Sequence, residues 1–256
     1  MFRFITLAVC ALWSSSTAAQ TIRYFPVSAH TAGQFDTVWV TDARIFNPDP
    51  LQPITVGVGY MITTPGVVPP VPVEIAPLTA AHLDDILGQF LQTHGTAGIM
   101  LQSDSPFFAS SRTYTIDDGG GSYGQYVAAV GSEHMTVQGF LLSLRNQPEQ
   151  PGFRTNIGFL KPETGFSESV TLRVLDLDTS EELGAVTWEL PWFGQSQLND
   201  VFNAIGRGDE AHANAGVAFT ATCPVFAYAS VVDNLTGDAI FVTPVGIEAG
   251  PPLDAR

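Results

Sequence analysis

The chain contains a long internal repeat. Residues 39–48 reappear in outline at 153–162, and residues 105–111 reappear at 223–229. The first pair of segments begins 114 residues apart, and the prolines of the second pair lie 118 residues apart. Because the two offsets are nearly equal, they indicate one long duplicated unit rather than scattered short motifs. A unit of this length is a domain, so we expect two similar domains in series.

An export signal precedes the first unit. Arg3 supplies a positive start, residues 4–13 are apolar, and small residues at 17–19 predict cleavage before Gln20. The apolar run is about half of the roughly 20 residues that cross a bilayer, and no later run is that long. We expect a signal peptide at 1–19, repeats at 20–131 and 132–256, and no transmembrane segment after cleavage. The expected location is secreted, periplasmic or at the cell surface.

The charge and cysteine content narrow the possible partners. The formal net charge is −15 and becomes −16 when Arg3 leaves with the signal, which argues against nucleic acid and anionic membrane surfaces as partners. Cleavage also removes Cys10, so Cys223 is left without an intramolecular disulfide partner. Only 14% of residues are charged and 45% are apolar, which fits strands buried in a core. Nothing in the sequence indicates a cofactor.

The hydrophobic pattern of the first unit predicts strands. Residues 38–46 alternate between apolar and polar side chains, as in a half-buried strand. Further strands are expected at 54–62, 73–75, 97–102, 107–116 and 123–130, and Pro70 and Pro72 place the 73–75 strand at a sheet edge. Thr79 is a candidate N-cap for a helix at 80–91, where apolar residues recur at helical spacing.

The second unit repeats this order. A strand within 135–144 opens it, and further strands are expected at 153–160, 169–177, 183–190, 215–220, 225–232 and 239–245, with a helix at 196–205. Six or seven short strands per unit predict an all-β fold. We expect two tandem immunoglobulin-like β-sandwich domains, each with one short helix.

Three patterns in the sequence have both a chemical and an ordinary structural explanation. The string around Ser122 matches the G-x-S-x-G motif of serine hydrolases, but a strand pattern follows where that motif needs a helix, so a hairpin is the favoured interpretation. Acidic residues in two corresponding loops could bind calcium, but Asp and Asn before Gly also suit β-turns; these acids are Asp117, Asp118, Asp233 and Asp238. The five histidines are dispersed and predict no zinc site.

An aromatic cluster is the candidate binding site. Trp188, Trp192 and Phe193 lie close together in sequence and could stack on sugar rings. Nearby acids or amides could bind the hydroxyl groups; these are Glu189, Gln195 or Gln197. The alternative is that these rings cover the helix that follows.

Several segments resemble a known group of proteins. The 105–114 segment, the 84–87 segment and the 154–158 strand are similar to uncharacterised secreted bacterial tandem β-sandwich repeat proteins, which have no established activity. The resemblance implies an extracellular, noncatalytic role. We therefore expect a structural, adhesive or partner-binding module with a protein or glycan partner. The alternatives are a carbohydrate-binding module that uses Trp192 and, more distantly, a serine hydrolase at Ser122.

Overall fold

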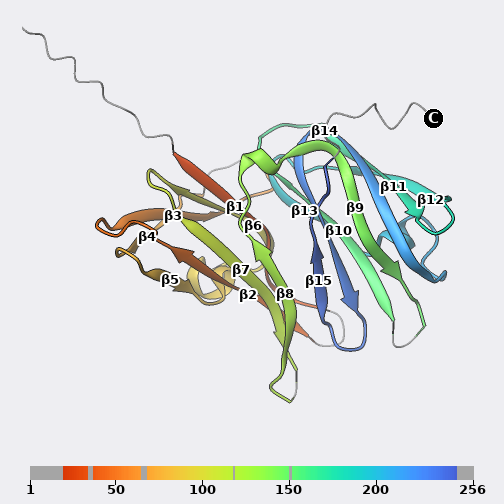
Figure 1. Ribbon diagram of the computed structural model, residues 1–256, viewed down its shortest axis with the longest axis horizontal. Helices are drawn as coiled ribbons and strands as arrows, with labels where there is room; N and C mark the ends of the chain where they lie inside the picture. The colour runs from red at the N-terminus through yellow and green to blue at the C-terminus, as the bar shows by residue number, and fades with distance from the viewer. Residues whose placement is uncertain (1–19, 34–36, 65–67, 118, 150–151, 247–256) are drawn as a thin grey trace, which may run out of the picture.

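Two β-sandwiches lie side by side in the computed structural model (Figure 1). The structure describes residues 20–33, 37–64, 68–117, 119–149 and 152–246, so the predicted signal peptide lies outside the described residues. No helix in these ranges is long and apolar enough to span a membrane. The all-β fold with two sandwiches, each with one short helix, is confirmed.

The first sandwich has eight strands. They are β1 (Thr21–Ala32), β2 (Val38–Phe46), β3 (Ile54–Tyr60), β4 (Val71–Ile75), β5 (Ala80–Leu83), β6 (Gly95–Ser103), β7 (Phe108–Ile116) and β8 (Ser122–Ala128). One layer has the order β4-β3-β6-β1 and the other β5-β2-β7-β8, and β1 joins them because its end also pairs with β2. The edge position predicted for β4 is therefore confirmed.

The second sandwich has the same strand order. Its strands are β9 (Thr136–Asn146), β10 (Phe153–Lys161), β11 (Ser169–Asp176), β12 (Glu182–Glu189), β13 (Gly194–Leu198), β14 (His212–Asp233) and β15 (Ala239–Val242). The first half of β14 lies between β11 and β9, and its second half pairs with β10 and β15. The layers are thus β12-β11-β14-β9 and β13-β10-β14-β15. The predicted boundary at 131/132 falls between β8 and β9, beside the 3-10 turn η2 (Ser132–His134).

Each sandwich closes around its own apolar core. The core of the first contains Phe25, Ile45, Val56, Ile99 and Leu101, with contributions from both layers. The core of the second contains Ile157, Phe159, Leu172, Val217 and Phe219. All ten of these side chains are fully buried, so each half has enough apolar contact to stabilise its two layers.

The helices predicted at 80–91 and 196–205 are wrong over most of their length. Residues 80–83 form β5 and pair with β2, and only one π-helical turn, η1 (Ile86–Phe90), follows. Likewise β13 extends to Leu198 and precedes the short helix α1 (Val201–Ala204). In the first sandwich the apolar residues with helical spacing belong to two elements: Leu83 ends β5, and Ile86, Leu87 and Phe90 lie in η1.

A left-handed aspartate causes this break in both sandwiches. Asp85 has φ of 46° and Asp200 has φ of 52°, which no right-handed helix accommodates. The backbone N–H of Asp85 donates to Asp42 Oδ1 at 2.9 Å, and that of Asp200 donates to Asn156 Oδ1 at 3.0 Å. The left-handed turns at Asp85 and Asp200 are therefore held by contacts with a neighbouring strand, and the local helical pattern does not predict them.

Candidate functional site

The two sandwiches touch through a third apolar cluster, the junction cluster. It contains side chains from both halves: Tyr24, Val27, Met61, Val127 and Val130 from the first, and Leu160, Phe226 and Tyr228 from the second. Strands β8 and β15 also contact each other at this junction (Figure 1). One end of the junction is therefore filled by buried apolar side chains, as a protein core is.

Tyr228 lies where this apolar contact becomes polar. Its ring packs directly over Gly158, where an added Cβ would come within 2.0 Å of the ring carbon Cζ. Its hydroxyl accepts from Gln195 Nε2 at 2.8 Å and donates to Gln197 Oε1 at 3.2 Å. Burial raises the pKa of the Tyr228 phenol, so the hydroxyl stays protonated and orients both amides.

Beyond Tyr228 the sandwiches leave a cleft of about 570 Å³, here called the inter-sandwich cleft. Strand alternation explains its lining, because Arg154 and Asn156 of β10 face outward while Ile157 faces the core. Five amide side chains line the wall: Gln125, Asn156, Gln195, Gln197 and Asn199. Apolar side chains also line it: Val27, Ala29, Ala32, Val232 and Ala239. Hydroxyl groups of Thr31, Thr96, Thr113, Ser196 and Ser230, the Asp200 carboxylate and the Trp39 ring complete most of it.

Several amide groups of the cleft retain hydrogen-bonding capacity. Ser230 Oγ donates to Gln125 Oε1 at 2.9 Å, and Gln197 Nε2 donates to Asn199 Oδ1 at 2.7 Å. These bonds, with that from Asp200 N to Asn156, occupy the amide oxygens of Gln125, Asn156 and Asn199. Within the described residues, the amide nitrogens of the same three side chains have no hydrogen-bond partner. The cleft therefore presents NH₂ donors to a ligand.

Arg154 is the cation of the cleft. Its side chain is half-buried, and Nη1 donates to Asn234 Oδ1. Burial lowers the pKa of the Arg154 guanidinium from its ordinary value, and nearby Asp200 opposes that effect. The guanidinium remains charged at any ordinary pH, because arginine does not lose its proton in proteins.

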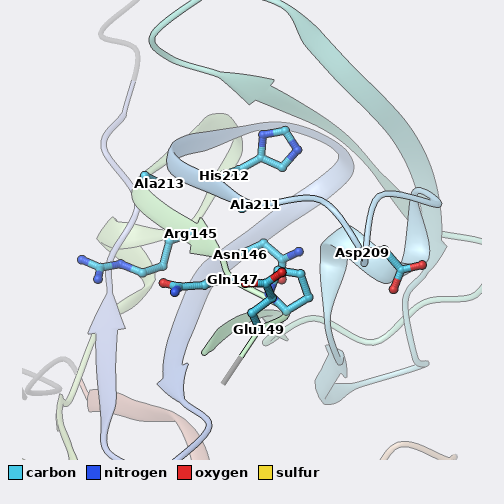
Figure 2. Close-up of a pocket in the computed structure, with 9 residues that line it drawn as sticks. Arg145, Asn146, Gln147, Glu149, Asp209, Ala211, His212 and Ala213 are labelled. Carbon is cyan, nitrogen blue, oxygen red and sulfur yellow. The ribbon is translucent and has the colours of Figure 1, made fainter. Parts of the chain in front are cut away.

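A second hollow, here called the end pocket, lies at the end of the second sandwich and has a volume of about 420 Å³. Figure 2 shows Arg145, Asn146 and Gln147 on one side of it and the segment that carries Asp209 and His212 on the other. Asn146 Nδ2 lies within hydrogen-bond reach of three backbone carbonyls of that segment, the shortest contact being 2.8 Å to Glu210 O. The Asn146 amide therefore holds the 207–210 segment against the end of β9.

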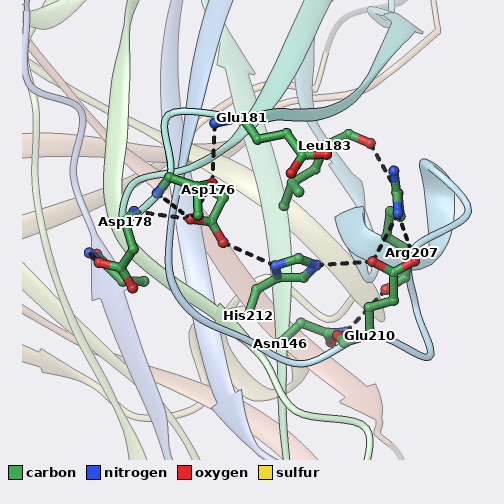
Figure 3. A network of polar contacts seen from close by, with 10 residues as sticks. Asn146, Asp176, Asp178, Glu181, Leu183, Arg207, Glu210 and His212 are labelled. Atoms are coloured by element: carbon green, nitrogen blue, oxygen red, sulfur yellow. Dashed lines mark hydrogen bonds and ion pairs between the residues drawn. The ribbon is translucent and has the colours of Figure 1, made fainter.

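His212 belongs to the same supporting network (Figure 3). Its Nδ1 lies 3.4 Å from Asp176 Oδ2, its Nε2 lies 3.6 Å from Glu210 Oε2, and its ring stacks on Phe202. Hydrogen bonds from Thr179 lower the pKa of Asp176, and Arg207 lowers the pKa of Glu210. Asp176 accepts from the backbone of the neighbouring turn and Glu210 accepts from Arg207, whereas the buried His212 Nε2 has no hydrogen-bond partner among the described residues. We assign the end pocket a structural role because its acids bind the surrounding turns.

The predicted aromatic site does not form one platform. Trp188 packs against the core of the second sandwich and donates to Ser196 Oγ at 3.3 Å, whereas Phe193 packs against the junction cluster. The ring of Trp192 lies 6.0 Å from that of Phe193 and 6.3 Å from that of Phe166, which is 69% exposed. The half-buried Trp192 ring therefore contacts both Phe193 and the exposed Phe166 ring. Gln195 and Gln197 line the cleft instead.

The acidic loops lie close together, but their oxygens bind backbone. Asp117 Oδ1 accepts from Gly121 N, and Asp233 Oδ1 accepts from Leu235 N and Thr236 N, as in β-turns. Asp238 Oδ1 accepts from Gly124 N of strand β8 at 3.3 Å. Asp118 lies outside the described residues. The described part of the chain contains no group of three or more His, Cys, Asp or Glu side chains suited to a metal ion.

Ser122 begins strand β8 and pairs with Ile116 across the hairpin. Its hydroxyl accepts a hydrogen bond from Arg112 at 3.0 Å. The strand-to-helix turn that presents a serine nucleophile is therefore not formed at this position.

Comparison with protein-family models, curated proteins and solved structures finds no significant match. The assignment of the inter-sandwich cleft as a candidate site therefore depends on its lining residues. Of the hydroxyl-binding residues predicted from the sequence, Gln195 and Gln197 line the cleft, whereas Glu189 is exposed at the end of β12 and does not. Asn156, Gln125 and Arg154 were not predicted as site residues. The sequence does show amides at strand positions that point away from the core. It does not show which strands of the two sandwiches face each other across a cleft.

Proposed function

We propose that this protein is a noncatalytic, exported binding module that holds a glycan in the inter-sandwich cleft. The observation that carries the proposal is the set of amide nitrogens, contributed by both sandwiches, that have no hydrogen-bond partner among the described residues: those of Gln125, Asn156 and Asn199. Sugars offer hydroxyl groups at several positions, and a wall of amides and hydroxyls can bind them from more than one side. The Trp39 ring adds a flat apolar surface for a pyranose face.

Other features support a site of action in the cell envelope or outside the cell. The predicted signal peptide directs export, and the net charge of −15 opposes nucleic-acid binding. The cleft brings together no nucleophile and base in hydrogen-bonding contact among the described residues, so the proposed role is binding.

A glycan array followed by calorimetry on the full chain tests this role. The double variant Trp39→Ala/Asn199→Ala removes a ring and an NH₂ donor from the cleft. We expect affinity for the best array ligand to fall roughly tenfold or more, because each lost contact costs about 1 kcal/mol. Trp192→Ala, which is outside the cleft, is the matched control and should leave affinity unchanged.

The contact between the exposed Phe166 ring and the half-buried Trp192 ring supports a second candidate, a carbohydrate platform on the outer surface. In that case Trp192→Ala abolishes binding and the cleft variant retains it. Absence of binding to every glycan on the array would contradict both candidates.

A further inference from the structure

We propose that the glycan carries a carboxylate, as a uronic acid does, and that Arg154 binds this group. This inference rests on the proposed function, since it names the class of ligand that the same cleft takes. The decisive feature is the position of Arg154, a half-buried cation in a wall of amide, hydroxyl and apolar side chains where the other charged residue is Asp200.

Arg154 differs from the other described cations in its partners. Five of them contact a carboxylate: Arg23, Arg44, Lys161, Arg173 and Arg207. Arg112 and Arg145 lie over the aromatic rings of Tyr114 and Phe153. Arg154 has neither kind of contact among the described residues and donates to the neutral amide oxygen of Asn234. Asp200 attracts Arg154 through space but makes no ion pair with it among the described residues, so the guanidinium keeps donors for an external anion.

The geometry of the guanidinium suits a carboxylate. The group has five N–H donors in a planar fork, and Asn234 engages one nitrogen, Nη1. The remaining nitrogens can bind both oxygens of a carboxylate, which makes charge-assisted bonds stronger than those to a neutral hydroxyl. The NH₂ group of Asn156, two residues along the same strand face, can bind a hydroxyl of the same sugar.

The surroundings limit how much negative charge the ligand carries. The Asp200 carboxylate also lines the cleft, and the whole chain is acidic. Repulsion therefore opposes a long polyanion, whereas a short oligosaccharide with one uronate places its single charge on Arg154. We infer selectivity for a short, singly charged acidic saccharide.

Calorimetry with matched sugars tests the inference on the full chain. The probes are disaccharides that contain glucuronate or galacturonate, their methyl esters, and the corresponding neutral glucosides and galactosides. We expect at least one uronate to bind roughly tenfold or more tighter than its ester and its neutral counterpart, since bonds to charged groups exceed neutral ones by about that factor. The comparison with the ester needs no variant.

Two variants assign the effect to Arg154. Arg154→Gln should bind the uronate and its neutral counterpart equally, while Arg112→Gln, at an exposed arginine outside the cleft, should keep the wild-type preference. Circular dichroism verifies that both variants fold, and the ester comparison decides the question if Arg154→Gln does not. Equal binding of uronate, ester and neutral sugar by the wild type overturns this inference but leaves the proposed function intact. Absence of binding to any sugar overturns both.

Discussion

Two buried side chains at corresponding strand ends hold the loops of their sandwiches. Asn47 Nδ2, at the end of β2, lies 2.9–3.2 Å from the carbonyl oxygens of Gln52, Ile75 and Ala76. Lys161 Nζ, at the end of β10, lies 2.7–3.2 Å from three carbonyl oxygens and 3.0 Å from Glu168. Both side chains are almost fully buried. Asn47 and Lys161 stabilise the fold because they donate hydrogen bonds to carbonyl groups that would otherwise be buried without donors.

Replacing Lys161 should therefore be costly. Lys161→Met keeps the volume but leaves three carbonyl groups and the Glu168 carboxylate without their donor. We expect the free energy of unfolding to fall by about 3–5 kcal/mol, as when one partner of a buried ion pair is removed. Urea denaturation measures it.

The control is Arg44→Gln, which breaks the exposed pair with Asp84 and should cost less than about 1 kcal/mol. Equal costs for the two variants would show that the Lys161 contacts do not stabilise the fold.

The packing of β10 against β14 depends on a glycine. Gly158 of β10 is paired with Tyr228 of β14, and the tyrosine ring occupies the space that a side chain at 158 would need. The close approach lets the Tyr228 hydroxyl reach Gln195 and Gln197 on β13. One missing Cβ thus shapes the wall of the cleft.

Gly158→Ala should displace the Tyr228 ring. An added Cβ at 2.0 Å from Cζ forces a shift in a packed region, and such overpacking costs about 1–3 kcal/mol. Thermal and urea unfolding measure the loss of stability.

Gly59→Ala is the matched control, since its nearest neighbour would be an ordinary 3.6 Å contact with Pro70. In a double-mutant cycle, Gly158→Ala should cost less when Tyr228 is already alanine. Additive costs would mean that the two residues are not coupled.

The junction cluster joins the sandwiches into one folded unit. Leu160 is fully buried in it, and its Cδ1 lies where a side chain at Gly98 of the first sandwich would be. Backbone hydrogen bonds of 2.8 Å in both directions join Tyr24 and Val130, so the segment between β8 and β9 is tied to β1. Because both halves line the cleft, this contact determines the width of the cleft.

Leu160→Ala should weaken both sandwiches. A buried leucine truncated to alanine costs about 2–5 kcal/mol, and here the cavity lies between the two halves. Hydrogen exchange should become faster in β8 of the first sandwich as well as in β10 and β14 of the second.

Leu172→Ala removes the same side chain from the core of the second sandwich and should accelerate exchange mainly there. If Leu160→Ala also affects the second sandwich alone, the junction does not couple the halves.

Local sequence patterns were sufficient for most strands. The alternation at 38–46 predicted β2 with its observed bounds, and the proline-rich stretch correctly placed β4 at an edge. Strand periodicity is a local property, because successive side chains point to opposite faces whatever the rest of the chain does. The same local reasoning failed at 80–91, where Asp42 holds Asp85 in a left-handed corner.

The cleft was decided by tertiary structure. Gln125 and Ser230 are 105 residues apart and hydrogen-bond at 2.9 Å because β8 and β14 meet at the junction. From the sequence alone, Gln195 and Gln197 were recognised as polar candidates, but Arg154 could not be distinguished from the paired arginines. Whether a cation has a partner depends on distances between strands remote in the chain. The sequence by itself determined the all-β fold of two sandwiches, whereas only the packing of one on the other determined where a ligand can bind.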